Sequence, residues 1–343
     1  MSDDQLAFGW GDADRPAPAA ALLPRASALA ERLRALSLRG VYIGTSSWKY
    51  TGWLGQVYDP TRYTTRGRLS QKRFNESCLA EYARVFPTVC GDFAFYRFPT
   101  PAFWERTFDP VSAGFRFSLK VPEDITVQRF PKLPRYGRRG GEDNPSFLDA
   151  GLLTDRLLAP LAPYRDRLGV LILQFGTFHR GPMADPTQFA ERLDAFLRQI
   201  PTDRFQLAVE VRNRAFLHDA PDYLDCLRSH GVAHCLNSWT RMPPIGEQLA
   251  LPGVRTAPHT AARFLLRPGR TYAQAVDRFA PYERVQDPYP EGRDALRRLI
   301  DGLGSGRQQI YIFVNNRLEG NAIETIEAAV GRPGTAPGNI APP

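Results

Sequence analysis

Five charged residues lie inside or directly after apolar segments of this 343-residue chain: Asp92, Lys120, Glu210, Arg212 and Arg267. Two carboxylates in different environments can act as general acid and general base, and we place Lys120 with them as a candidate catalytic group. Three cations against two acids leave a positive surplus, which favours a bound anion because unpaired buried charge is costly. The alternative is a purely structural network of ion pairs.

Eight short apolar runs alternate with helical patterns along the chain. The runs cover residues 41–48, 89–96, 115–121, 169–175, 206–213, 233–239, 262–268 and 309–316, and the clearest helical stretches cover 70–85, 185–200, 219–230 and 290–303. This alternation predicts an α/β fold, a single parallel (β/α)8 TIM barrel. An open doubly wound sheet is the alternative, but no GxGxxG motif follows the first run.

Side-chain alternation predicts which residues face the barrel interior. In the second run, Asp92 shares its parity with Cys90 and Tyr96, whereas Phe93 and Phe95 have the parity expected to pack beneath helices. The polar parity of the other runs contains Ser118, Lys120, Gln174, Glu210, Arg212, Asn237, Arg267 and Asn315. These residues fall mainly near the carboxyl ends of the strands, where barrel enzymes place their active sites.

The segment VYIGTSSWKYTGWLGQVYDP, residues 41–60, begins as a strand and continues into a loop rich in aromatic residues. Trp48 and Tyr50 lie closest to the strand, and we expect them to form a stacking wall with Tyr96. Trp53 and Tyr58 lie farther along and are expected to anchor the loop. Four amides are predicted to orient polar groups of a ligand: Gln174, Asn237, Asn315 and Asn316.

Two loops predicted above the same face are basic. Residues 61–73 and residues 129–139 carry five Lys or Arg each, and the second loop also contains Phe130 and Tyr136. Basic loops with aromatic residues can bind phosphates and stack on bases or sugars. The alternative for each loop is a solvated surface segment, since the net charge of the whole chain is already +8.

Other patterns bound the possibilities. The four cysteines form no CxxC pair and the five histidines no HxH or HExxH motif, so we expect no metal site built on these residues and no cofactor. A single ion held by oxygen ligands is the alternative. The absence of a Walker loop argues against a nucleotide hydrolase of that type. No run approaches eighteen apolar residues and no signal peptide is evident, so we expect no membrane span and a cytoplasmic location.

The order and spacing of several segments resemble a known family. IGTSSWKYTGWLGQVY, VCGDFAFYRFPT, FRFSLKVP, NPSFLD, LGVLILQF, LAVEVRN and FVNNRLEGNA are similar to segments of domain of unknown function 72, the YecE-like proteins. The resemblance covers about residues 39–328 and implies a single TIM barrel without an established activity. Many members have Glu and Asn where this chain has Cys90 and Asp92, and a Leu-His-Gly end where it has LLRPG.

The predicted domain organisation places one barrel between two extensions. Residues 1–38 form an N-terminal extension, disordered and then helical, residues 39–330 form the barrel, and residues 331–343 form a flexible tail. The leading hypothesis is a pocket for an anionic ligand, phosphate-containing or nucleic-acid-like, with hydrolysis as the reaction class considered. The alternatives are a non-catalytic nucleic-acid-binding barrel and a glycosidase-like site using Asp92 and Glu210. Whether the protein is an enzyme, its substrate and its oligomeric state stay open.

Overall fold

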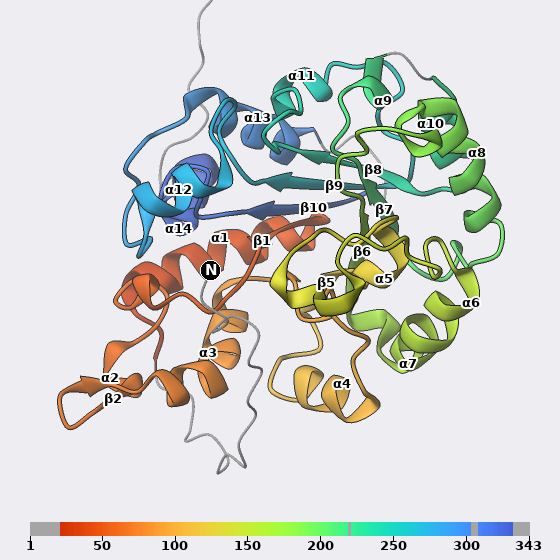
Figure 1. The fold of residues 1–343 in the computed structure, drawn as a ribbon. Coiled ribbons are helices and arrows are strands. Elements are labelled where there is room, and N and C mark those ends of the chain that lie inside the picture. Colours follow the sequence, from red (N-terminus) through yellow and green to blue (C-terminus); the bar gives the residue numbers. More distant parts are fainter. Residues whose placement is uncertain (1–20, 219–220, 303–307, 332–343) are drawn as a thin grey trace, which may run out of the picture.

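The computed structural model describes residues 21–218, 221–302 and 308–331 and contains a closed barrel of parallel strands (Figure 1). The barrel strands are β1 (Val41–Thr45), β4 (Thr88–Gly91), β5 (Arg116–Lys120), β6 (Leu168–Gln174), β7 (Leu207–Glu210), β8 (Ala233–Asn237), β9 (His259–Phe264) and β10 (Gln309–Val314). Their order around the barrel follows the chain, and β1 closes it by pairing with both β4 and β10. The predicted TIM-barrel fold is confirmed.

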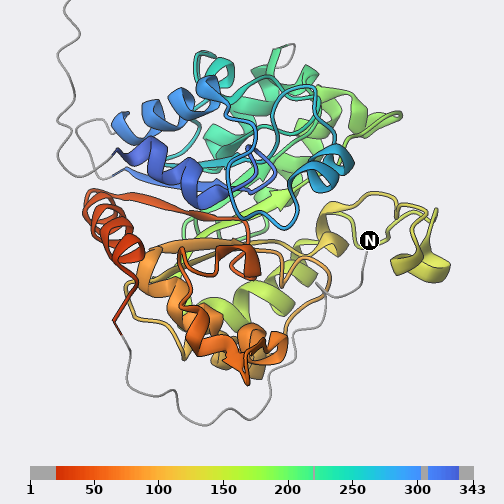
Figure 2. The same cartoon turned by 90° about the vertical axis from the view of Figure 1, so that its left-hand side faces the viewer.

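Helices surround the strands on the outside of the barrel (Figures 1 and 2). They are α1 (Pro24–Leu38), α2 (Pro60–Tyr63), α3 (Gln71–Val85), α4 (Pro101–Phe108), α5 (Glu123–Thr126), α6 (Ala150–Leu153), α7 (Ala159–Leu161), α8 (Pro186–Leu197), α9 (Ala215–His218), α10 (Pro221–Ser229), α11 (Ile245–Gln248), α12 (Tyr272–Phe279), α13 (Pro290–Asp301) and α14 (Ala322–Val330). Within the described ranges, none of these helices combines the length and apolar character needed to cross a membrane.

The N-terminal helix that the sequence predicts is α1. It buries Ala26, Leu29 and Leu33, which recur at helical spacing, and it packs on β1, α3 and α14 at the outer surface of the barrel. The predicted disordered tip and most of the predicted tail, residues 1–20 and 332–343, lie outside the described residues.

The strands separate two apolar clusters. A large outer cluster lies between the strands and the surrounding helices. The small inner cluster fills the barrel and consists of Cys90, Val170, Ile172, Ala208, Ala233, Cys235, Ala261, Tyr311 and Phe313. Small residues such as Ala and Cys are frequent in this inner set, and the longer polar side chains of the same strands lie toward their carboxyl ends. The interior is therefore apolar in its middle and charged at its mouth.

The second strand is shorter than the sequence pattern predicts. The apolar run covers residues 89–96, but β4 ends at Gly91 and the chain turns, with the Phe95 backbone N–H donating to the Asp92 carbonyl at 3.0 Å. A Cβ at Gly91 would lie 2.0 Å from the Phe93 ring, so this position requires glycine. The turn places Asp92 at the barrel mouth, and Phe93 joins the outer cluster.

Barrel closure depends on a close approach between β1 and β4. A Cβ added at Gly44 would lie 2.0 Å from the Thr88 carbonyl oxygen, so Gly44→Ala forces these two strands apart. We expect the substitution to lower the free energy of unfolding by about 1–3 kcal/mol or more, measured by chemical denaturation. Gly114→Ala is the control, because no atom lies within 4 Å of its added Cβ. Equal losses in both variants would contradict the role of Gly44.

Candidate functional site at the barrel mouth

The carboxyl ends of neighbouring strands bring four polar side chains together inside the barrel. Lys120, Gln174 and Glu210 are the last residues of β5, β6 and β7, and Arg263 is the penultimate residue of β9. All four are buried, and Gln174 is opposite Glu210 in the β6–β7 register. Side-chain alternation therefore places Lys120, Gln174 and Glu210 where the sequence pattern predicts them. Arg263 was missing from the predicted set.

Glu210 lies at the centre of this group and is fully buried. Its Oε2 accepts a hydrogen bond from Arg263 Nη1 at 2.5 Å, and its Oε1 accepts from Arg212 Nε at 3.3 Å and Nη2 at 3.2 Å. Arg263 Nη1 also donates to Gln174 Oε1 at 2.9 Å. The Arg212 guanidinium stacks over the Trp239 ring at 3.8 Å, so both arginines are held in fixed orientations.

The environment keeps Glu210 ionised. Burial by itself would raise the pKa of this carboxyl, but the positive charges of Arg263 and Arg212 outweigh burial and lower the pKa below its ordinary value. A general acid or base that works near neutral pH needs a pKa near that range. Glu210 is therefore suited to orienting the two arginines and poorly suited to proton transfer.

Lys120 forms the second ion pair of the mouth. Its Nζ lies 2.9 Å from Asp92 Oδ1 and 4.1 Å from the centroid of the Phe95 ring. Burial lowers the pKa of Lys120 and Arg263 lowers it further, whereas Asp92 opposes both effects. The Lys120 side chain is buried but that of Asp92 is about half exposed, at 46%. Asp92 is thus the partner of this pair that is open to solvent.

The charges of the mouth do not balance. Lys120, Arg212 and Arg263 face only Asp92 and Glu210, and Arg263 Nε is a buried donor without a hydrogen-bond partner among the described residues. The neighbouring Cys90 adds no negative charge, because burial raises the pKa of its thiol to about 12. The mouth therefore keeps the surplus of positive charge that the sequence predicts, but Arg263 takes the place of Arg267 as the third cation.

Arg317 is a second cation that sequence reasoning missed. It donates to Asn315 Oδ1 at 3.1 Å and to the Tyr272 hydroxyl at 3.1 Å, and it lies close enough to Asp92 and Tyr50 to interact electrostatically with both. No carboxylate forms an ion pair with it in the described part of the chain, and its buried Nε–H lacks a partner there. The sequence could have indicated Arg317, because it directly follows the Asn315–Asn316 pair after β10 and so lies at the carboxyl end of a barrel strand.

The predicted aromatic wall is only partly at the mouth. Tyr50 is half-buried beside Tyr282, with ring centroids 5.5 Å apart, and Tyr96 is 36% exposed beneath the guanidinium of Arg135. Trp48 is instead buried in the outer cluster, edge-on to Phe93. Tyr50 and Tyr96 are thus partly exposed, whereas Trp48 is buried against the helices.

The fully buried loop aromatics are anchors, as the sequence suggested. Trp53 donates from Nε1 to Asn316 Oδ1 at 3.2 Å, and the Tyr58 hydroxyl donates to the Trp48 carbonyl. Both rings stack in the outer cluster with centroids 6.3 Å apart. They fix the path of the loop that carries Tyr50.

The three predicted asparagines hold the backbone of the loops at the mouth. Asn237 Nδ2 donates to the carbonyls of Val211 and Cys235, and Asn316 Oδ1 accepts from the Ala322 N–H at 2.8 Å. Asn315 Oδ1 accepts from both the backbone and the side chain of Arg317. Asn237 Nδ2 and the oxygens of Asn315 and Asn316 are thus engaged with the protein itself, which suits them to positioning the loops. Asn316 Nδ2, in contrast, is a buried donor without a hydrogen-bond partner among the described residues.

Arg267 lies apart from the other predicted cations. The sequence run covers residues 262–268, but β9 is formed by His259–Phe264 and has already ended before Arg267. Arg263, which has the same parity and lies inside the strand, takes the interior position. Arg267 pairs with Asp287 at 2.9 Å and borders a hollow of about 560 Å³ that also contains Arg298, Glu247 and Glu291, where the charges balance.

The two basic loops do not converge. In Figure 2 the orange hairpin of β2 (Thr64–Thr65) and β3 (Arg68–Leu69) lies at the lower edge, whereas the yellow segment near residues 129–143 projects to the right. Arginines of the second loop are paired with acids: Arg135 with Glu123 at 3.2 Å, Arg139 with Asp124 at 2.9 Å and Arg129 with Asp143 at 3.6 Å. One continuous basic surface is therefore not formed by these loops.

Comparison with known proteins gives a family and a fold. Residues 42–339 match the model of a family described as protein of unknown function DUF72. A DUF72 family protein from Thermotoga maritima MSB8 is 20% identical, with a TM-score of 0.54 over 83% of this chain and 96% of the other. A DUF72 family protein from Enterococcus faecalis V583 is 17% identical, with a TM-score of 0.56 over 84% and 94%. No curated protein matches the chain.

The carboxylate of Glu210 can be tested for its structural role. Glu210→Gln leaves the buried Arg263 and the partly buried Arg212 without their anion, so we expect the free energy of unfolding to fall by about 3–5 kcal/mol at pH 7. Glu191→Gln, at an exposed position, is the matched control and should change it by less than about 0.5 kcal/mol. Both values come from urea denaturation followed by circular dichroism.

The pH dependence of this loss has a defined sign. The pKa of Glu210 is lower in the folded protein than its ordinary value of 4.5. The ionised carboxylate therefore contributes its full share to the free energy of unfolding above pH 4.5. This contribution is lost as the pH falls below 4.5, because the unfolded chain then binds the proton more readily. The difference between the wild type and Glu210→Gln should therefore narrow below pH 4.5. A difference that stays constant from pH 7 to pH 3.5 would refute the assigned ion pairs.

Proposed function

The chain belongs to the DUF72 family of proteins of unknown function, with a TIM-barrel fold, and on this premise we propose that it binds a phosphate-bearing small molecule at the carboxyl-terminal face of its barrel. The observation that carries the proposal is the surplus of buried positive charge. Among the described residues, Lys120, Arg212 and Arg263 form ion pairs with Asp92 and Glu210 alone. An anion that enters beside them compensates a charge that burial would otherwise penalise.

The donors that would hold the anion are the free edges of two guanidinium groups. Arg263 and Arg317 each keep a buried Nε–H without a partner among the described residues. Arginine presents several donors in a planar fork that matches phosphate oxygens, and such charge-assisted bonds are stronger than neutral ones. Glu210 supports this arrangement by holding Arg263 and Arg212 in place before the ligand arrives.

The aromatic residues around Arg317 suggest the rest of the ligand. Tyr50 and Tyr282 pack against each other, and the Arg317 guanidinium lies 4.3 Å from the centroid of the Tyr272 ring. Tyr96 is partly exposed on the side of Asp92. A sugar or nucleobase attached to the phosphate would have flat surfaces on which to stack. We therefore assign the ligand to sugar phosphates and nucleotides.

Lys120 and Asp92 are the groups that we assign to proton transfer. Their ion pair joins a buried amine to a partly exposed carboxylate at the mouth, and burial lowers the pKa of the Lys120 amine. The glycosidase-like alternative needs one protonated carboxyl as the general acid, and the lowered pKa of Glu210 disfavours that role for it. The nucleic-acid alternative needs a continuous basic surface, and the two basic loops are separated and partly neutralised by acids. The reaction that we propose for these groups is hydrolysis of the phosphate ester of the bound ligand.

Thermal unfolding of the protein with AMP, ribose 5-phosphate, adenosine and ribose tests the proposal. The phosphorylated compounds should raise the melting temperature and their unphosphorylated parents should not, because a ligand that prefers the folded state stabilises it. Arg317→Gln should weaken phosphate-dependent binding about ten-fold or more, the loss of one charge-assisted hydrogen bond. Its protein partners are neutral, so the fold does not depend on its charge.

Arg267→Gln serves as the control, because Arg267 lies outside the mouth, and it should leave binding unchanged. Equal effects of the two substitutions would count against the assigned site. Failure of both phosphorylated compounds, combined with salt-sensitive binding of an oligonucleotide that Arg66→Gln weakens, would favour the nucleic-acid alternative instead.

A further inference from the structure

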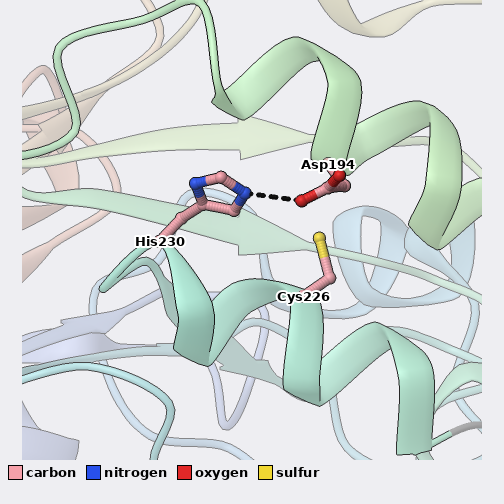
Figure 3. Close-up of side chains that lie close together, drawn as sticks. All are labelled: Asp194, Cys226 and His230. Atoms are coloured by element: carbon pink, nitrogen blue, oxygen red, sulfur yellow. Dashed lines mark hydrogen bonds and ion pairs between the residues drawn. The ribbon is translucent and has the colours of Figure 1, made fainter.

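A cluster of three potential metal ligands lies on the outside of the barrel, away from the mouth. Asp194 is in α8, Cys226 is in α10, and His230 immediately follows α10, four residues after Cys226. The two helices pack side by side (Figure 1), so the cluster joins neighbouring elements of the outer layer. Figure 3 shows the three side chains pointing toward one another across the gap between these helices.

The distances between the ligand atoms are close to those of a tetrahedral site. One atom from each residue, the Asp194 oxygen, the Cys226 sulfur and a His230 nitrogen, all lie within 4.8 Å of one another. Bonds of about 2.0–2.3 Å to zinc place tetrahedral ligand atoms about 3.3–3.8 Å apart. A shift of about 1 Å in the side chains would therefore suffice to reach metal-bonding geometry.

The hydrogen bond within the cluster marks where a cation would enter. His230 Nε2 and Asp194 Oδ1 are 2.8 Å apart, and in Figure 3 the Cys226 sulfur lies on one side of this pair. A divalent ion would take the place of the proton that the two groups share. One thiolate, one imidazole and one carboxylate form a set that zinc prefers, whereas calcium and magnesium prefer oxygen ligands alone.

The surroundings allow such binding. Arg198 Nη2 contacts Asp194 Oδ2 at 2.8 Å, but its side chain is 71% exposed and can turn into solvent without loss of packing. Burial, together with a smaller contribution from the Asp194 carboxylate, raises the pKa of Cys226 to about 12, so a bound cation has to displace the thiol proton.

We propose that Asp194, Cys226 and His230 bind one zinc ion between α8 and α10, with water as the fourth ligand. Binding forms the Zn–S and Zn–N bonds, releases the thiol proton to solvent and moves the proton of His230 Nε2 to Nδ1 through solvent, with no change of oxidation state. The CxxxH spacing of residues 226–230 is present in the sequence, but the third ligand comes from a different helix. The proposal does not depend on the ligand assigned to the barrel mouth.

Cobalt titration of the full-length protein, freed of metal with EDTA, tests the site. One equivalent of Co²⁺ should produce the visible bands of tetrahedral cobalt together with a thiolate-to-cobalt charge-transfer band, and one equivalent of Zn²⁺ should remove them. Cys226→Ser should abolish the charge-transfer band, and His230→Ala should weaken cobalt binding at least about ten-fold. Cys78→Ser, a substitution of another buried cysteine on α3, should retain the band.

A further variant tests whether Asp194 binds the metal or only forms ion pairs with its neighbours. Arg198→Gln removes the cation that competes for Asp194, so it should tighten cobalt binding by about two- to five-fold, the range expected for a surface ion pair. Circular dichroism of each metal-free variant establishes that it is folded. Absence of the charge-transfer band in the wild type, or its persistence in Cys226→Ser, would overturn the proposed site.

Discussion

The ion pairs of buried Glu210 are the interaction on which the barrel mouth depends. A fully buried carboxylate is tolerated only when its charge is compensated, and here Arg263 and Arg212 provide that compensation from two different strand ends. In return, Glu210 fixes the direction of both guanidinium groups. The two arginines also lower the pKa of the Glu210 carboxyl, so its charge is kept and suits it to orienting them.

The rest of the mouth is arranged around this fixed centre. The small side chains of the inner cluster fill the barrel below it, which leaves room for long polar side chains only at the carboxyl ends of the strands. The amides of Asn237, Asn315 and Asn316 then hold the loops that leave those ends. Lys120, Asp92 and Arg317 complete the charge distribution, and its positive surplus is the physical basis of the anion-binding proposal.

Side-chain alternation predicted much of this arrangement but failed where a strand end had to be known. Lys120, Gln174 and Glu210 lie at the last positions of their strands, so parity alone placed them inside. Arg263 and Arg267 share a parity, and only the pairing of β9 with β8 and β10 shows that the strand ends at Phe264. Trp48 was similarly ambiguous, because an aromatic residue after a strand can turn toward the mouth or toward the helices, and packing against Phe93 decided between them.

The sequence by itself determined the class of the fold and the identity of most interior positions. Both follow from local periodicity, since alternating apolar runs and helical patterns are properties of neighbouring residues. The tertiary structure decided which charges meet, which aromatic residues are exposed, and that Asp194 lies beside Cys226 and His230. Those contacts join residues far apart in the chain, and they depend on strand register, turn position and helix packing, which no local pattern encodes.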